Sequence, residues 1–162
     1  MIPKSMELFL KERLPERTWR NRVVREDGRC YMEFSAIDVE RLSRLGITVD
    51  QLGPKLLACI WDEDSSEEVG GYLVVDNLAM GRPAMGGIRI SPNLTPAEVF
   101  YRARGMTLKN AAAFLPYGGG KVGLVADPHL DEVRRQEVLQ RVAHLLVRYN
   151  DLFLPGHGKA GL

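Results

Sequence analysis

At residues 106–110 the sequence reads Met-Thr-Leu-Lys-Asn, and at residues 118–121 it reads Gly-Gly-Gly-Lys. Both phrases lie in an apolar stretch, and each places one lysine among small side chains. Lys109 falls near the end of a predicted helix, where a cation is favourable in any case. Lys121 stands at the head of a buried-type strand, where an unpaired ammonium is costly. A lysine in such a place has either a structural partner or a chemical task.

The chemical interpretation follows from how burial and charge act on an amine. Desolvation lowers the pKa of a lysine, and a second cation nearby lowers it further. Such a lysine can take up a proton near neutral pH, and neighbouring glycines let backbone amides or a ligand come close. The residues alone leave both readings open: Lys109 as a solvated helix lysine or a fixed cation, and Lys121 as a structural or a catalytic amine.

Three ligand motifs are excluded by their spacing. The Gly118–Lys121 phrase is not a P-loop, because Leu115 and Val122 occupy the places of its first Gly and its Ser or Thr. No G-x-G-x-x-G follows a strand and opens a helix, so the sequence lacks a dinucleotide fingerprint. The acidic cluster at residues 62–68 lacks calcium-loop spacing and is interpreted as a solvated turn.

Composition narrows the class of protein. The 162 residues suffice for one domain with a sizeable core. The 22 basic and 21 acidic side chains leave a charge of +1, which offers no field for nucleic acid or for a membrane surface. No apolar run reaches the roughly 20 residues of a transmembrane helix. The N-terminus lacks a signal-peptide core, and Cys30 and Cys59 have no metal spacing, so we expect a cytoplasmic protein with reduced thiols.

Periodicity and turn residues predict the elements. Helices are predicted at residues 5–14, 38–45, 96–113 and 131–149. Strands are predicted at residues 23–24, 31–34, 54–61, 70–75, 88–90 and 121–126, with loops at 76–87, 116–120 and 150–162. Asp27-Gly28 signals a hairpin, and Thr95, Pro96 and Glu98 make the clearest helix start. The order favours a three-layer α/β/α domain whose sheet is mostly parallel, with antiparallel edge strands from the N-terminal half.

Three phrases in one order and spacing carry a resemblance to a known family: residues 81–89, 105–113 and 115–123. The sequence resembles the N-terminal substrate-binding and dimerisation domain of the glutamate/leucine/phenylalanine/valine dehydrogenases. The resemblance implies reversible oxidative deamination of an L-amino acid to a 2-oxo acid and ammonia, with NAD or NADP.

The resemblance also implies roles for individual residues. Lys109 would bind the substrate α-carboxylate, and Lys121 would be the low-pKa lysine that activates water or carries a proton. Gly86 and Gly87 would line the substrate pocket. Met85 stands where glutamate-specific members have a lysine for the side-chain carboxylate, so the match favours an apolar amino acid, although Leu115-Pro116-Tyr117 resembles the glutamate enzymes.

Two further departures concern the rest of the reaction. The family has a catalytic aspartate after a proline downstream of the last helix, whereas residues 154–159 hold no carboxylate, and His157 is interpreted as a tail residue. The family's dinucleotide-binding domain is missing from residues 1–162. We therefore expect a single substrate-binding and dimerisation domain that does not bind NAD or NADP and is inactive by itself.

The composition and the family resemblance together predict which molecules this chain binds. We expect a small amino acid or 2-oxo acid as ligand, no nucleic acid, no membrane and no metal. The resemblance implies a homo-oligomer that pairs through the strands at Val23-Val24 and Tyr31–Phe34. Two alternatives remain: a stand-alone module that senses a carboxylate metabolite through Lys109 and Lys121, and a purely structural oligomerisation domain.

Overall fold

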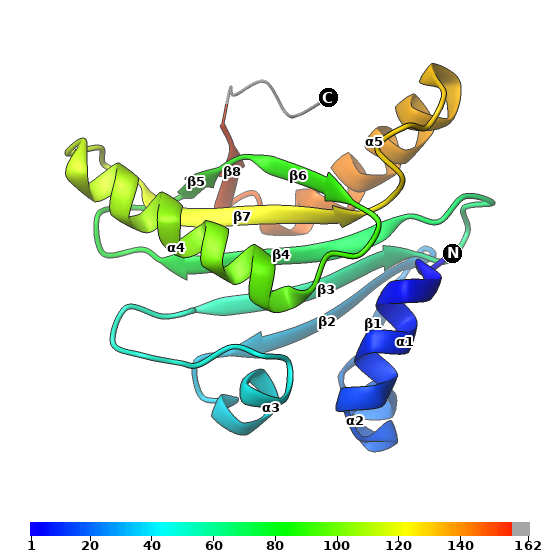
Figure 1. Cartoon of the computed structure of the whole chain (residues 1–162), viewed down its shortest axis with the longest axis horizontal. Coiled ribbons are helices and arrows are strands. Elements are labelled where there is room, and N and C mark those ends of the chain that lie inside the picture. The colour runs from blue at the N-terminus through cyan, green and yellow to red at the C-terminus, as the bar shows by residue number, and fades with distance from the viewer. Residues whose placement is uncertain (157–162) are drawn as a thin grey trace.

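The computed structural model describes residues 1–156, and these form one open sheet with helices on both faces (Figure 1). The strand order is β1-β2-β3-β4-β7-β5-β8, and β6 pairs with β7 beside this path. The strands are β1 (Val24–Glu26), β2 (Arg29–Ser35), β3 (Leu56–Asp62), β4 (Gly70–Asn77), β5 (Ala84–Gly86), β6 (Ile88–Ser91), β7 (Gly118–Val125) and β8 (Phe153–Pro155).

The N-terminal half supplies the antiparallel part of the sheet. Antiparallel pairing runs from β1 through β2, β3 and β4 to β7. The β1–β2 hairpin turns at Asp27 (φ 49°) and Gly28 (φ 76°), the left-handed backbone that a two-residue hairpin turn requires. The predicted hairpin and antiparallel edge are confirmed. Strand β1 is the outermost strand, and all three of its residues are exposed.

Parallel pairing is confined to β5, β6 and β8, which lie against β7 or against each other. The α/β class is therefore confirmed, but the sheet is mixed rather than mostly parallel, because its longest pairings are antiparallel. Strands β5 and β8 fall in stretches that the sequence predicts to be loop. Each has three residues, which is too short for an alternating pattern to show.

Helices cover both faces, which confirms the three layers (Figure 1). One face carries α1 (Lys4–Arg13), α2 (Glu16–Arg22), α3 (Val39–Arg44) and α4 (Pro96–Ala112). The other carries α5 (Glu132–Leu146), which continues into the 3₁₀ turn η1 (Val147–Tyr149). Along β4, Tyr72 and Val74 pack in the first core, which lies between the sheet and α1–α4. Leu73 and Val75 pack in the second core, between the sheet and α5, as the strand period of two requires. None of the helices described has the length and apolar character needed to cross a membrane.

Helix α2 is the one described α-helix that the sequence analysis does not predict. Its residues, Glu16–Arg22, are mostly polar, and the residue before them, Pro15, is of a type that often ends a helix. Pro15 instead precedes the first turn of α2, a position that proline tolerates because the amide it lacks would have no helical partner. The helix is held by burial of Thr18 and by packing of Trp19 against the first core.

Helix α4 begins as predicted. Thr95 Oγ1 accepts a hydrogen bond from the Glu98 amide at 3.4 Å, and Glu98 Oε2 accepts one from the Thr95 amide at 3.3 Å. This reciprocal pair is a capping box, with Pro96 in the first turn. The start of α4 is thus fixed by local chemistry, which sets the phase of every side chain that follows along the helix.

The glycines at the start of β7 lie inside the strand, so the loop expected at residues 116–120 ends sooner. Gly119 lies under Thr107, and a Cβ there would overlap the backbone and Oγ1 of that residue. Gly123 lies under Val99, and a Cβ there would overlap its Cγ2. Close packing of α4 on β7, rather than a flexible loop, is what these glycines permit.

Candidate functional site

Lys121 projects from β7 on the side that carries α4. Gly119, two residues earlier, packs under Thr107 of α4, and strand alternation puts Lys121 on the same face. Its side chain is half-buried. Lys121 Nζ lies 3.1 Å from the position that a Cβ on Gly87 would take, and Gly87 links β5 to β6. The amine is therefore held over β7, between α4 and the β5–β6 segment.

The surroundings of Lys121 disfavour the charged form of its amine. Burial is the largest cause of a lowered pKa at Lys121, followed by the positive charges of Arg102, Lys109 and Arg89. No acidic group is among the causes. Among residues 1–156, none of these four side chains forms an ion pair with a carboxylate. An anion brought here would find an uncompensated positive field.

Lys109 lies in the last turn of α4 and is exposed. Arg102 precedes it by seven residues, so the two lie on one stripe of the helix, and the effect of Arg102 on Lys121 exceeds that of Lys109. Arg89 projects from β6, which pairs in parallel with β7. The structure thus brings Lys109 into the electrostatic neighbourhood of Lys121 and adds two arginines to which the sequence analysis gives no role. The seven-residue spacing between Arg102 and Lys109 is the sequence signal from which Arg102 could have been predicted as part of this site.

Gly86 and Gly87 are fixed in place by backbone packing and backbone hydrogen bonds. Gly86 packs against Gly120 so closely that a Cβ on Gly86 would collide with the carbonyl oxygen of that residue. The Gly86 carbonyl accepts a hydrogen bond from the Gly156 amide at 2.9 Å, and the Gly87 carbonyl accepts one from the Val122 amide at 3.2 Å. The two glycines therefore form a fixed wall beside the Lys121 amine, without side chains of their own.

Asn110, buried on α4, ties the helix to this wall. Its Nδ2 donates to the Gly118 carbonyl at 2.8 Å and approaches the Met85 carbonyl at 3.4 Å. Met85 itself lies on β5, half-buried, opposite Gly119 of β7 and Leu154 of β8. Its thioether has no charge to offer an anion. The structure thus places Met85 in the strand that leads directly into the glycine pair.

A dinucleotide is not matched by the residues described. Phosphate binding of that type needs a glycine loop that opens a helix, whereas the glycines of residues 118–123 lie within β7. Within residues 1–156, no group of three or more His, Cys, Asp or Glu side chains could hold a metal ion. His157 lies outside the described residues.

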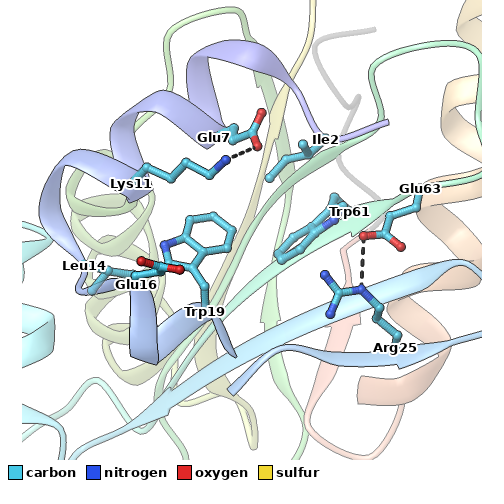
Figure 2. A pocket seen from close by; sticks show the side chains of 9 residues that line it. All are labelled: Ile2, Glu7, Lys11, Leu14, Glu16, Trp19, Arg25, Trp61 and Glu63. Carbon is cyan, nitrogen blue, oxygen red and sulfur yellow. Dashed lines mark hydrogen bonds and ion pairs between the residues drawn. The ribbon is translucent and has the colours of Figure 1, made fainter. Parts of the chain in front are cut away.

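A hollow of about 470 Å³ lies away from Lys121, between α1, α2, β1 and β3 (Figure 2). The rings of Trp19 and Trp61, with centroids 5.9 Å apart, form its apolar wall. Ion pairs lie at its rim, Lys11 to Glu7 at 2.6 Å and Arg25 to Glu63 at 3.2 Å (Figure 2). Because both rim cations are already paired with carboxylates, this hollow is less suited to an anionic ligand than the surroundings of Lys121.

Comparison with known proteins decides the family. A family model described as the Glu/Leu/Phe/Val dehydrogenase dimerisation domain matches residues 57–152. This chain belongs to the Glu/Leu/Phe/Val dehydrogenase family. The matched residues of this dehydrogenase domain run from β3 through α5 and include Lys109 and Lys121.

Curated relatives agree with the family. The dehydrogenase domain is 41% identical over 102 residues to the NADP(+)-dependent glutamate dehydrogenase of Pyrobaculum calidifontis, covering 60% of this chain and 24% of the relative. It is 39% identical over 80 residues to the NAD-specific glutamate dehydrogenase of Staphylococcus aureus strain COL, covering 49% of this chain and 19% of the relative. The aligned part thus spans about a quarter or less of these relatives' length.

Solved structures carry the same fold. The L-tryptophan dehydrogenase of Nostoc punctiforme matches with a TM-score of 0.50 and 28% identity, over 57% of this chain and 28% of that one. The hetero-hexameric glutamate dehydrogenase of Thermus thermophilus, in its Leu-bound form, matches with a TM-score of 0.50 and 24% identity, over 96% of this chain and 33% of that one. The second likeness extends the shared fold over nearly the whole domain.

Proposed function

We propose that this chain is the substrate-binding and dimerisation domain of an NAD(P)-dependent L-amino-acid dehydrogenase. The observation that carries the proposal is the half-buried Lys121 amine, held over Gly87 and facing the positive charges of Arg102, Lys109 and Arg89. The reaction is oxidative deamination of an L-amino acid to a 2-oxo acid and ammonia. The dinucleotide would be bound outside the residues described.

In the proposed reaction the two lysines have different tasks. Lys109 binds the substrate α-carboxylate, because it is a solvated cation with no carboxylate partner on the described chain. Lys121, in its neutral form, removes a proton from the water that adds to the C=N carbon of the 2-imino acid. That imino acid would form once a bound dinucleotide has accepted the α-hydrogen of the amino acid as hydride. A bound carboxylate offsets the neighbouring positive charges, which raises the pKa of Lys121 and helps it retain that proton.

The proposed substrate is an apolar amino acid rather than glutamate. Met85 is the support, since it offers no charge to a side-chain carboxylate. Gly87 places no side chain beside the Lys121 amine, and Gly86 is packed against Gly120, so the substrate side chain would meet backbone and a thioether on this wall.

The proposed assembly is a homo-oligomer in which β1 of one copy pairs with that of another. The exposed outer edge of β1 supports this, because an unpaired strand edge presents free backbone donors and acceptors. The buried free thiols Cys30 and Cys59 fit a reducing, cytoplasmic setting. If oligomerisation were the sole function, a dimer would form while no carboxylate ligand bound.

Isothermal calorimetry with 4-methyl-2-oxopentanoate and with 2-oxoglutarate tests the ligand site. We expect binding of the first that Lys109→Ala weakens by about tenfold or more, as for loss of a charge-assisted bond. Lys55→Ala, at an exposed lysine just before β3, is the matched control and should bind as the wild type does. No detectable binding of any 2-oxo acid by the folded wild type would contradict the proposal.

Two further measurements separate the alternatives. We expect no turnover of amino acids by the 162-residue chain with NAD or NADP, and turnover at ordinary enzymatic rates would refute its inactivity in isolation. Sedimentation at micromolar concentration should show a dimer or larger species, and replacement of Arg25, the central residue of β1, by proline should weaken it. A monomer with intact carboxylate binding would favour the stand-alone sensing module.

A further inference from the structure

A buried carboxylate lies at the contact between α4 and the sheet, close to the proposed site. Asp76, near the end of β4, is fully buried. It accepts hydrogen bonds from Thr107 Oγ1 at 2.7 Å and from Arg104 Nε and Nη2 at 2.7 Å and 3.1 Å. Arg104 also donates to both carboxylate oxygens of Asp50 at 2.8 Å. Among residues 1–156, the side-chain donors that reach Asp76 all come from α4, and a buried carboxylate without them would be costly.

Thr107 is fixed from two directions. Its hydroxyl is bound to Asp76, and its backbone lies directly on Gly119 of β7, where no Cβ fits. The helix can therefore neither move closer to the sheet nor turn about its axis without breaking the bond to Asp76. Lys109 follows Thr107 by two residues, and Lys121 follows Gly119 by two, so one contact sets the relation of both amines.

We propose that Asp76 is a positioning residue for the amine pair. By fixing the rotation and height of α4 on β7, it holds Lys109 and Arg102 beside Lys121. The consequence for ligand binding rests on the function proposed above, whereas the consequence for the Lys121 amine does not.

The geometry makes the site sensitive to small movements of α4. One residue of slippage turns a helix by about 100° and advances it by about 1.5 Å, which would change the position of Lys109 relative to Lys121. Even a partial movement separates the cations and admits water, and both changes return the pKa of Lys121 towards its ordinary value. Asp76 would thus act on the reaction without touching the substrate.

A purely structural role is the alternative, and the chain supplies a matched control. Asp38 is also buried and bound by an arginine, Arg22, through both carboxylate oxygens, with the Ser35 amide as a further donor. It precedes α3 rather than lying against α4. Asp38→Asn removes a comparable buried ion pair and is expected to lower stability, but it leaves the contact between Thr107 and Gly119 intact.

The test compares Asp76→Asn, Thr107→Val, Thr107→Ser and Asp38→Asn with the wild type. The first readout is the pH dependence of Lys121 acetylation by acetic anhydride, followed by mass spectrometry of its peptide. We expect Asp76→Asn and Thr107→Val to raise the pKa of Lys121, Thr107→Ser to retain the wild-type value, and Asp38→Asn to leave it unchanged. Thr107→Val, which keeps the side-chain shape, decides the matter if Asp76→Asn does not fold.

The second readout is calorimetric binding of 4-methyl-2-oxopentanoate, which we expect the first two variants to weaken by about tenfold while the last two bind as the wild type does. A folded Thr107→Val with the wild-type pKa at Lys121 would overturn the positioning role. So would an equal change of that pKa in Asp38→Asn. If the wild type binds no 2-oxo acid, the proposed function fails, and the acetylation profiles still decide the role of Asp76.

Discussion

Thr107 of α4 and Gly119 of β7 lie in direct contact, with no space between them for one additional carbon atom. The contact joins the two elements that carry the proposed site, since Lys109 and Lys121 each follow it by two residues. Whatever loosens this contact changes both the stability of the domain and the separation of its amines.

Gly119→Ala tests the contact itself. A Cβ at this position would overlap backbone, which cannot move aside as a flexible side chain can, so we expect a loss of about 1–3 kcal/mol or more. Gly105→Ala, on α4, is the control, because nothing lies within 4 Å of the new Cβ. It should stabilise the domain by about 1 kcal/mol. Urea unfolding measures the free energy of unfolding of both variants. Equal stability of Gly119→Ala and the wild type would show that the contact can accommodate a Cβ.

Lys121 should make stability depend on pH in a defined direction. The pKa of Lys121 is lowered in the folded chain, chiefly by burial, so the unfolded chain binds more protons below the ordinary lysine pKa. Stability therefore rises with pH across the interval between the folded and unfolded pKa values. Lys121→Met should remove this rise and stabilise the domain below the interval, whereas Lys55→Met should not. Urea unfolding at a series of pH values tests this, and parallel curves for Lys121→Met and the wild type would contradict it.

Phe114 should be replaceable with a gain in stability. It follows α4 with a φ of 54°, and its side chain is 87% exposed. The left-handed backbone costs a non-glycine residue about 1–2 kcal/mol, and the exposed ring contributes little packing in return. Phe114→Gly should therefore stabilise the domain by about 0.5–1 kcal/mol, after the entropy of glycine is subtracted. Phe114→Ala keeps the strain and serves as the control; identical thermal unfolding of the two variants would exclude this account.

Asp50 should contribute to acid unfolding. Its hydrogen bonds with Arg104 are the largest cause that lowers the pKa of Asp50 from 3.8 to about 2. A carboxylate with a lowered pKa stabilises the fold above its unfolded value, and this contribution is lost as pH falls from about 4 to about 2. Asp50→Asn should therefore flatten the fall in stability over that range, while Asp151→Asn, at an exposed turn, should not. Circular dichroism during acid titration, with urea present, measures this fall in stability. An equally steep fall in Asp50→Asn and the wild type would show that the pair of Asp50 and Arg104 has no such effect.

Met85→Lys should redirect ligand preference. The new ammonium would lie in β5, immediately before the glycine pair, where it can meet a second carboxylate of the ligand. We expect affinity for 2-oxoglutarate to rise by about tenfold, the scale of one charge-assisted hydrogen bond. Met80→Lys adds the same charge at an exposed loop position and is the control. Equal calorimetric gains in both variants would mean that net charge, rather than position, sets the affinity.

Local signals in the sequence predict much of this fold. The Asp27-Gly28 hairpin, the Thr95 capping box and the apolar stripe of α5 are encoded by neighbouring residues, and each is confirmed. Strands β5 and β8 are not predictable in this way, because three residues become a strand only when a partner strand is present. The same holds for the direction of pairing, which the sequence analysis expected to be mostly parallel.

The amine pair and the glycine wall could be predicted because their residues lie within short phrases. The roles proposed for Lys109, Lys121, Met85, Gly86 and Gly87 remain predictions, which the structure accommodates by placing them around one region. Asp76 could not be found from sequence, since its hydrogen bonds reach α4 across some thirty residues of chain. A buried carboxylate is recognisable only once the elements that cover it are known.

The hydrogen bond from the Gly156 amide to the Gly86 carbonyl has a mechanical consequence. The last described strand, β8, pairs with β5 and ends beside the glycine pair, so force applied to the chain beyond Gly156 would act first on Gly86, in the wall of the proposed site. A tether, a fusion partner or a moving neighbour attached at that end would thus pull directly on the glycine pair of the proposed site.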